Sequence, residues 1–336
     1  MYKRQAIDHG VNYVDTAYNY MGGHSERVTG LALQDGYREK VFLATKSPTY
    51  LYQSEDDFDR FLNTQLERLQ TDHIDFYLLH TLGRENWDKV LKFGALDRLR
   101  QAKKDGKVRF IGFSFHDEFP VFKEIVDYLG DEWDFCQIQL NYLDMEEQAG
   151  YQGLQYAAER NLGVIIMEPL RGGALASVPK KAEALFTAHG KTPVEAALQF
   201  LWSMPEVGVV LSGMNSLEQV KGNLSYAEHI PERYFEREKA LFETAKATIE
   251  QYSLIGCTAC KYCADCPSGI KISDIFGIYN NYCKDGDDER AKSLYGALEK
   301  NAHDCIGCGQ CESLCPQHLP IISLLPKVDD AIQGKA

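Results

Sequence analysis

Three features are scarce in this sequence of 336 residues: long apolar runs, clustered basic residues and, over most of its length, cysteine. No uninterrupted run of about 18 apolar residues, the length of a membrane-spanning helix, occurs, and the first ten residues lack the apolar core of a signal peptide. Acidic residues outnumber basic ones by 49 to 36, which gives a formal net charge of −13. The sequence therefore predicts a cytoplasmic protein that binds neither membranes nor nucleic acid.

Cysteine is almost absent from the first 256 residues, where only Cys136 occurs, but nine cysteines crowd between Cys257 and Cys315. In a chain without a secretory signal, closely spaced cysteines indicate metal binding or redox chemistry rather than disulfides. The change in composition predicts two domains, residues 1–240 and residues 250–330.

The first domain alternates short apolar, β-rich runs with amphipathic stretches. The seven runs expected to form strands are residues 12–18, 41–47, 74–81, 108–115, 135–142, 163–170 and 208–215. Stretches with helical periodicity lie between them, for example residues 56–70, 87–106 and 192–204. This alternation predicts a parallel α/β sheet and favours a (β/α)8 barrel of the TIM type over a doubly wound sheet. No G-x-G-x-x-G fingerprint follows an early strand.

Seven strands are one fewer than a closed barrel of this type needs. The chain opens in an expected helix, residues 3–10, which should follow a first strand. We therefore expect either a barrel whose first strand is missing from this chain, or one in which another segment fills the gap between the first and last visible strands.

Polar side chains stand at or just after the carboxyl ends of the first three strands, where β/α barrels gather their functional groups: Asp15, Tyr20, Lys46 and His80. Singly, each has an ordinary explanation as a surface aromatic or a weak ion pair. Together they suit carbonyl reduction, in which a proton donor neutralises the oxygen after hydride reaches the carbon. Tyr20 would supply the proton, Lys46 would favour the phenolate, and Asp15 would keep Lys46 charged. His80 would donate to the substrate oxygen or relay a proton.

The segment VNYVDTAYNYMGGHSERVTGLAL resembles the aldo-keto reductase motif, in which an Asp-Thr-Ala run precedes the active-site tyrosine, and Lys46 and His80 also match. The resemblance covers about residues 1–230. It implies an enzyme that binds NADPH or NADH in extended form without a Rossmann fold and reduces an aldehyde or ketone. We favour NADPH, although Lys221 is the only basic residue close to the expected phosphate site.

The same resemblance implies two sets of cofactor-binding residues. For the nicotinamide they are Ser114, Gln137 and Asn141, with Met167 where many relatives carry a stacking tyrosine. The segment VVLSGMNSLEQVKGNL resembles the adenosine-phosphate site, which implies Gly213, Asn215, Gln219 and Asn223. Tyr50, Tyr52 and Trp87 are candidates to line the substrate site.

The cysteine-rich region contains two runs, CTACKYCADCP from residue 257 and CIGCGQCESLCP from residue 305. The second is the bacterial ferredoxin spacing C-x2-C-x2-C-x3-C-P, and the first is one residue shorter before its last cysteine. In two-cluster ferredoxins the fourth cysteine of each run binds the other cluster. This predicts two 4Fe-4S clusters in a small α-helical ferredoxin-like domain. The ligand sets are Cys257, Cys260, Cys263 with Cys315, and Cys305, Cys308, Cys311 with Cys266.

Two alternatives for the cysteines stay open. One cluster could use Cys305, Cys308, Cys311 and Cys315 while the first run has a structural role, or the thiolates could hold structural zinc.

The whole sequence predicts an NAD(P)H-dependent oxidoreductase that acts on a small carbonyl compound, with clusters that exchange electrons with a redox protein partner or sense redox state. The alternative is an electron-transfer or redox-sensing protein that binds nicotinamide without turning over free substrate.

Overall fold

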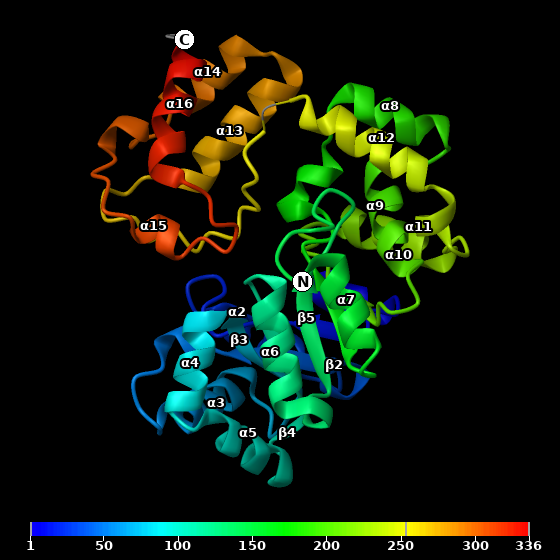
Figure 1. Cartoon of the computed structure of the whole chain (residues 1–336), viewed down its shortest axis with the longest axis vertical. Coiled ribbons are helices and arrows are strands. Elements are labelled where there is room, and N and C mark those ends of the chain that lie inside the picture. The colour runs from blue at the N-terminus through cyan, green and yellow to red at the C-terminus, as the bar shows by residue number, and fades with distance from the viewer. Residues whose placement is uncertain (1, 253, 335–336) are drawn as a thin grey trace. The chain divides into compact units, whose positions relative to one another are not determined.

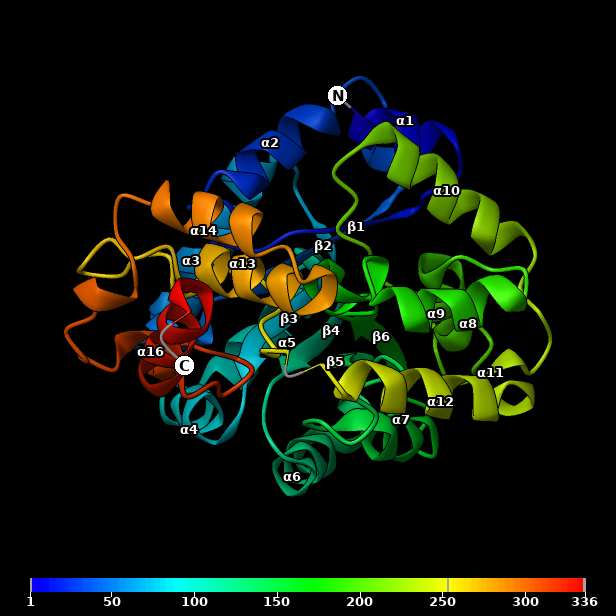
Figure 2. The same cartoon turned by 90° about the horizontal axis from the view of Figure 1, so that it is seen from above.

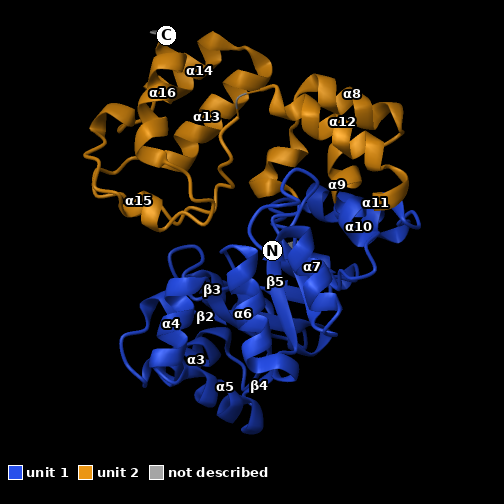
Figure 3. Ribbon diagram, in the orientation of Figure 1, with its two compact units in different colours: residues 1–169, 198–234 blue, residues 170–197, 235–336 orange. Residues whose placement is uncertain are grey.

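The computed structural model describes residues 2–252 and 254–334, which form two compact units (Figure 3). The first unit contains residues 1–169 and 198–234, and the second contains residues 170–197 and 235–336. The second unit therefore includes residues 170–197, a segment between two of the expected strands. Within the described ranges, no helix has both the length and the apolar character needed to cross a bilayer.

Seven parallel strands, β1 to β7, form one sheet in which neighbours along the chain are neighbours in space (Figures 1 and 2). Their bounds are Tyr13–Asp15, Phe42–Ser47, Ile74–Leu82, Val108–Phe115, Phe135–Gln139, Gly163–Met167 and Val209–Val210. All seven predicted strands are present, and the predicted TIM-type α/β architecture is confirmed. Among the described residues no strand pairs with the outer edge of β1 or of β7, so the sheet is a curled half-barrel.

Helices of the first unit precede, connect or follow the strands, and they lie around the sheet when it is seen from above (Figure 2). They are α1 (Tyr2–Asp8), α2 (Ser25–Ala32), α3 (Asp57–Leu69), α4 (Arg84–Lys92), α5 (Ala95–Lys104), α6 (Phe119–Leu129), α7 (Gly150–Ala158) and α10 (Leu217–Glu228). The stretch 87–106 differs from a continuous helix because it breaks at Gly94, whose φ of +62° suits glycine and separates α4 from α5. Three short 3-10 helices, η1 (Arg38–Lys40), η2 (Thr49–Leu51) and η3 (Gly130–Glu132), lie in the loops.

Apolar side chains of the strands pack together in the first unit. Ala44, Leu78, Phe135 and Ile165 form a buried cluster on neighbouring strands. The ring of Phe76 packs within 5.1 Å of its neighbours in β1, β4 and β5, measured between ring centroids. This packing holds the strands together, while the polar side chains gather at their carboxyl ends.

The second unit is entirely helical among its described residues. It contains η4 (Arg171–Ala176), α8 (Lys180–Ala188), α12 (Lys239–Glu250), α13 (Ile272–Asp285), α14 (Asp288–Gly296), η5 (Ala302–Asp304), α15 (Gln310–Ser313) and α16 (Ile321–Gln333). Two more helices, α9 (Pro193–Trp202) and α11 (Tyr234–Arg237), cross the boundaries between the units. Ile275, Phe276 and Leu325 are fully buried between α13 and α16. This confirms a small C-terminal helical domain.

Helix α2 lies against the end of α3 at Gly30. A Cβ atom at this position would lie 2.7 Å from the carbonyl oxygens of Arg68 and Leu69 at the end of α3. We expect Gly30→Ala to lower the free energy of unfolding by about 2 kcal/mol, because the two backbones would have to separate. Urea denaturation followed by circular dichroism measures this change.

Gly222→Ala provides the control because Gly222 lies inside α10, where an added Cβ would come no closer than 3.8 Å to the Tyr226 side chain. This variant should be neutral or slightly more stable than the wild type, since alanine favours helix. Equal destabilisation by both variants would contradict the close approach of α2 and α3.

Candidate functional site

A buried lysine lies at the centre of the candidate site. Lys46, near the end of β2, is fully buried. Its Nζ donates to both carboxylate oxygens of Asp15, at 2.8 and 2.7 Å, and to the carbonyl oxygen of Thr16 at 2.9 Å. The same Nζ lies 3.3 Å from Tyr20 Oη. The structure thus brings together the predicted Asp15, Tyr20 and Lys46, which come from two strand ends and the loop after β1.

His80 joins this group through an irregularity in β3. Leu79 pairs with Phe113 and Leu82 with Phe115, so two residues of β3 stand opposite Ser114 of β4. Such a bulge re-aims the side chains beside it and is common next to active sites. The His80 ring packs edge-on against the Tyr20 ring, with 5.9 Å between the ring centroids. The fourth predicted catalytic residue therefore lies beside Tyr20.

Thr81, in the same bulge, adopts a left-handed conformation with φ of +56°, which is rare for a β-branched residue. Its backbone N–H donates to Ser114 Oγ at 2.8 Å, and this bond helps to hold the unusual conformation. Ser114 thus stabilises the bulge that carries His80.

Burial dominates the electrostatics of the site. Burial lowers the pKa of Lys46 and raises the pKa of Asp15, and in each case the charge of the other residue opposes the shift. Burial also lowers the pKa of His80 well below its usual value, and the positive charge of Lys46 acts in the same direction. His80 is therefore a neutral imidazole at pH 7.

A second layer of buried polar residues supports β2, and the sequence reasoning missed it. Glu26 in α2 is fully buried and accepts hydrogen bonds from Thr45 at 2.7 Å and from Gln65 at 2.6 Å. Arg68 forms an ion pair with Glu26 at 3.1 Å. Gln65 also donates to the carbonyl oxygen of Lys46 at 2.9 Å. The one available signal was Gln65, a polar residue within the apolar stripe of α3.

Of the three candidate substrate-lining aromatics, only Tyr50 lies beside the site. Its ring packs edge-on against His80 with 6.0 Å between centroids. Tyr52 instead is hydrogen-bonded to Ser47 at 2.7 Å and stacks on Phe61. Trp87 is fully buried and packs against Tyr128.

The residues expected to hold the nicotinamide occupy consecutive strand ends. Ser114 in β4 pairs with Gln137 in β5, and both are buried. Gln137 Nε2 lies 3.5 Å from Met167 Sδ at the end of β6, while in the described part of the chain Gln137 Oε1 has no hydrogen-bond partner. A buried acceptor oxygen of this kind is suited to accept a hydrogen bond from the NH2 group of a carboxamide.

Asn141, the last of these residues, binds other protein groups. Its Nδ2 donates to Asp144 at 3.0 Å and to the Glu168 carbonyl oxygen at 3.1 Å. Its Oδ1 accepts from the backbone N–H groups of Leu143 and Asp144. The Asn141 side chain therefore ties the loop after β5 to the residue after β6.

The residues expected at the adenosine phosphate surround the start of α10. Ser216 caps this helix and accepts from the Gln219 N–H at 3.2 Å. Gln219 Oε1 accepts from the Asn215 N–H, and Asn223 donates to Ser212 Oγ at 2.9 Å. A Cβ added to Gly213 would meet no described atom within 4 Å. The loop after β7 therefore leads into a helix N-terminus, whose free N–H groups and dipole favour a phosphate.

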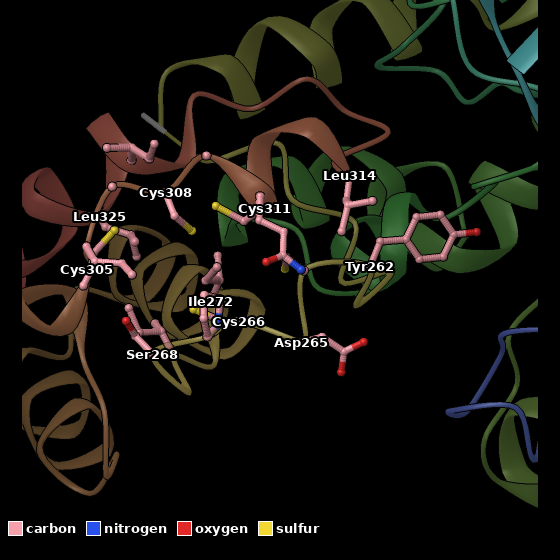
Figure 4. Close-up of a pocket in the computed structure, with 18 residues that line it drawn as sticks. Tyr262, Asp265, Cys266, Ser268, Ile272, Cys305, Cys308, Cys311, Leu314 and Leu325 are labelled. Carbon is pink, nitrogen blue, oxygen red and sulfur yellow. The ribbon is translucent and has the colours of Figure 1, made fainter. Parts of the chain in front are cut away.

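Two cavities in the second unit are lined by the eight predicted cluster ligands. One, of about 430 Å3 including space open to solvent, is shown in Figure 4. Its lining includes Cys266, Cys305, Cys308 and Cys311. The other, of about 350 Å3 on the same measure, has Cys257, Cys260, Cys263 and Cys315 in its lining. Cys263 lines both cavities. Each cavity thus has the fourth cysteine of one run beside the first three of the other.

Burial and the neighbouring cysteines disfavour the thiolate form of these cysteine side chains unless a compensating positive charge, such as that of cluster iron, is present. Burial raises the pKa of Cys263 to about 12, and the neighbouring Cys260, Cys257 and Cys315 raise it as well. Burial also raises the pKa of Cys311, and Cys305 acts in the same direction. Within the described ranges, no three His, Cys, Asp or Glu side chains converge on a single-ion site. Thiols gathered around apolar cavities are the donor set that 4Fe-4S clusters require.

Comparison with known families identifies both parts of the chain. Residues 3–237 match the aldo/keto reductase family, and residues 256–319 match a 4Fe-4S dicluster domain. The chain belongs to the aldo/keto reductase family. It is an oxidoreductase of this type with a C-terminal 4Fe-4S dicluster domain, which confirms the resemblance found in its sequence.

Individual relatives match the barrel region. L-galactose dehydrogenase from Arabidopsis thaliana is 26% identical over 246 residues, which cover 66% of this chain and 75% of the relative. An aldo-keto reductase from Mycobacterium sp. (strain KMS) is 29% identical, with 65% and 74% covered. Among solved structures, the holo form of aldo-keto reductase AKR11C1 from Bacillus halodurans superimposes with a TM-score of 0.59 at 25% identity, covering 72% of this chain and 86% of that one. An aldo-keto reductase from Klebsiella pneumoniae in complex with NADPH has the same fold, with a TM-score of 0.60 at 23% identity and coverage of 72% and 83%.

The lowered pKa of His80 has a measurable consequence. We expect nitrogen-15 NMR to find this imidazole neutral from pH 8 down to below pH 6, with His80→Gln used to assign the signal. Below pH about 6.5 the unfolded chain binds a proton that folded His80 does not. As the pH is lowered below this value, the free energy of unfolding should therefore decrease. His80 should contribute at most about 1.4 kcal/mol to this decrease for each pH unit.

His80→Gln should remove this part of the pH dependence, whereas the control His9→Gln, at an exposed position, should keep it. A His80 titration centred near pH 6.5 would contradict the burial argument.

Two double variants test whether the cluster ligands cross between the runs. If the fourth cysteine of each run binds the cluster of the other run, Cys257 and Cys315 bind the same cluster, and Cys305 and Cys315 bind different clusters. Cys257→Ser combined with Cys315→Ser then damages one cluster, whereas Cys305→Ser combined with Cys315→Ser damages both. We expect about four irons per chain in the first variant, close to none in the second, and about eight in the wild type. Iron and sulfide analysis of protein purified without oxygen provides the count.

Cys283→Ser is the matched control, because Cys283 lines neither cavity, and it should keep all the iron. The reverse order of the two iron counts would mean that each run holds its own cluster. A wild type with about four irons would contain a single cluster, and zinc without iron would exclude clusters.

Proposed function

We propose that this protein reduces an aldehyde or ketone with NADPH and uses Tyr20 as the proton donor. The observation that carries the proposal is the distance of 3.3 Å between Tyr20 Oη and the fully buried Lys46 Nζ, which Asp15 holds from the other side. Membership of the aldo/keto reductase family supports the same reaction.

The four residues have separate roles in this mechanism. NADPH, when bound, supplies a hydride to the carbonyl carbon, and negative charge develops on the oxygen. Tyr20 transfers its Oη proton to that oxygen, and Lys46 stabilises the phenolate that is left. Asp15 keeps the Lys46 ammonium oriented through two hydrogen bonds. Neutral His80 donates an N–H to the same oxygen. The Tyr50 ring packs edge-on against His80.

For the nicotinamide we propose that the Ser114 hydroxyl and the Gln137 amide bind the carboxamide group. The buried Gln137 Oε1 supports this role, because no described residue forms a hydrogen bond with it. Met167 would pack its polarizable thioether against the ring. Asn141 would act indirectly, because its hydrogen bonds hold the loop after β5 against Glu168.

For the phosphates we propose the loop after β7 and the start of α10, with Gly213, Asn215, Gln219 and Asn223 around them. The capped helix N-terminus supports an anion at this place. NADPH is favoured over NADH because a structure of the same fold is described with NADPH, although Lys221 is the only basic residue nearby in sequence.

For the second unit we propose two 4Fe-4S clusters that pass electrons to or from a redox protein partner. The two cysteine-lined cavities and the dicluster match support two clusters over one, and iron over zinc. Hydride carries two electrons, whereas each cluster carries one, so a pair of clusters can hold both electrons of one NADPH. Such clusters need a reducing compartment, so we propose a cytoplasmic location.

Two features favour a second candidate function: Met167, and the outer edges of β1 and β7, with which no strand pairs among the described residues. A site without a stacking tyrosine, at the rim of a half-barrel, could bind nicotinamide and pass its electrons to the clusters without reducing a carbonyl compound. In that case NADPH alone should bleach the cluster absorbance, and no carbonyl compound should be turned over.

Tyr20→Phe tests the proposed reaction. We expect kcat for the reduction of 4-nitrobenzaldehyde to fall at least about 100-fold, because the proton donor is lost, while the Kd for NADPH stays within about twofold. Stopped-flow absorbance measures the rate, and nucleotide fluorescence measures binding.

Tyr18→Phe is the matched control on the same loop, because the Tyr18 ring packs on Phe61 and lies against the Arg68 guanidinium. It should keep its activity. Unchanged reduction by Tyr20→Phe would refute Tyr20 as the donor, and inactivity of the wild type together with cluster reduction by NADPH would favour the second candidate function.

A further inference from the structure

A buried threonine hydroxyl lies inside the first cysteine run. Thr258 directly follows Cys257 and is 4% exposed. It lines the cavity that we call the first-run cavity, together with Cys257, Cys260, Cys263 and Cys315. In the part of the chain that the structure describes, no group forms a hydrogen bond with the buried Thr258 Oγ1. A buried hydroxyl without a partner is destabilising, so this one indicates an acceptor that the protein itself does not supply.

The wall of the first-run cavity around Thr258 is well packed within the second unit. Ile272, Phe276 and Ile321 line the cavity and are at most 3% exposed. A Cβ added to Gly172 would overlap the Thr258 carbonyl oxygen, so the two backbones are in direct contact. Thr258 is therefore covered on its backbone side and borders the cavity on the other. The acceptor for its hydroxyl has to come from the group that the cavity holds.

The second cysteine run has no hydroxyl at the matching position. The two runs begin C-T-A-C and C-I-G-C, so Ile306 stands where the first run has Thr258. Ile306 is 70% exposed, although it lines the cavity of its own run. Only the first run therefore places a buried hydroxyl between its first two cysteines.

We propose that the Thr258 hydroxyl donates a hydrogen bond to a sulfur atom of the 4Fe-4S cluster in the first-run cavity and thereby raises the midpoint potential of this cluster. Hydrogen bonds to the sulfur atoms are one of the factors that set the potential of such clusters. Reduction adds one electron and makes the sulfur atoms stronger acceptors, so the bond is stronger in the reduced state and favours it. This inference rests on the proposed function, which places one cluster in each cavity.

Thr258→Val tests the proposal because it removes the hydroxyl and keeps a side chain of similar shape. We expect the equilibrium constant for one-electron reduction of one cluster to fall about tenfold, which lowers its midpoint potential by about 59 mV. The potential of the other cluster should stay the same. Anaerobic potentiometric titration of the full chain with dithionite as the reductant, followed by EPR, measures both potentials.

Two further variants show whether the hydroxyl itself causes the change. Thr258→Ser keeps a hydroxyl and should lower the potential by less than half as much as Thr258→Val. Ser273→Ala is the matched control, because Ser273 lines the same cavity but its hydroxyl already donates to Asp274 Oδ1 at 3.4 Å. This variant should leave both potentials unchanged.

Cysteine variants assign the change to one cluster. Cys266→Ser combined with Cys305→Ser should leave only the cluster of the first-run cavity, and adding Thr258→Val should lower its potential as in the full set of ligands. Cys257→Ser combined with Cys315→Ser should leave only the other cluster, and there Thr258→Val should have no effect.

The outcomes separate this inference from the proposed function. If the wild type contains two clusters and Thr258→Val changes neither potential, the inference is overturned and the two-cluster proposal stands. An equal fall in Thr258→Ser and Thr258→Val, or a fall confined to the other cluster, also overturns it. A wild type without iron overturns both. If Thr258→Val does not bind iron, Thr258→Ala is measured in its place with the same expected result.

Discussion

The buried ammonium of Lys46 is the constraint on which the candidate active site depends. A charged group without solvent contact is strongly destabilising unless hydrogen bonds surround it, and Lys46 obtains them from Asp15, from the Thr16 carbonyl oxygen and from Tyr20. These three partners lie within six consecutive residues of the chain. Stabilising the charge therefore also determines the path of the loop after β1, and with it the position of the Tyr20 hydroxyl.

The polar layer behind β2 serves the same constraint from the other side. Gln65 binds the carbonyl oxygen of Lys46, and its partner Glu26 is itself neutralised by Arg68. Arg68 also donates to the Tyr18 carbonyl oxygen at 3.3 Å, so the loop that carries Tyr20 is held from α3 as well. Because each buried charge has its partner on a different element, the lysine, the tyrosine and the two helices cannot shift independently.

Local patterns in the sequence predicted the strands, the order of the sheet and the cysteine runs, because apolar runs and ligand spacing are properties of short segments. The same reasoning could not find the bulge at Thr81 or the pairing of Glu26 with Arg68, since both depend on partners more than 30 residues away. For Asn141 the sequence predicted the position after a strand but not the contacts of its side chain. Its amide forms hydrogen bonds with the loop after β5 and with the Glu168 carbonyl oxygen. The contact of Gly172 with Thr258 joins segments 86 residues apart and leaves no local signal beyond the glycine itself.

Residues 170–197 follow the barrel strand β6 in the chain but belong to the second unit. Within that unit, a Cβ added to Gly172 would overlap the Thr258 carbonyl oxygen, and the N–H groups of Gly173 and Leu175 donate to the Leu170 carbonyl oxygen. A segment that continues the barrel in sequence therefore packs on the first cysteine run. Arg171, Gly172 and Gly173 all have positive φ, a conformation that persists in a non-glycine residue only where the surrounding structure holds it. The fold of this segment thus depends on the cysteine-rich region as well as on its own sequence.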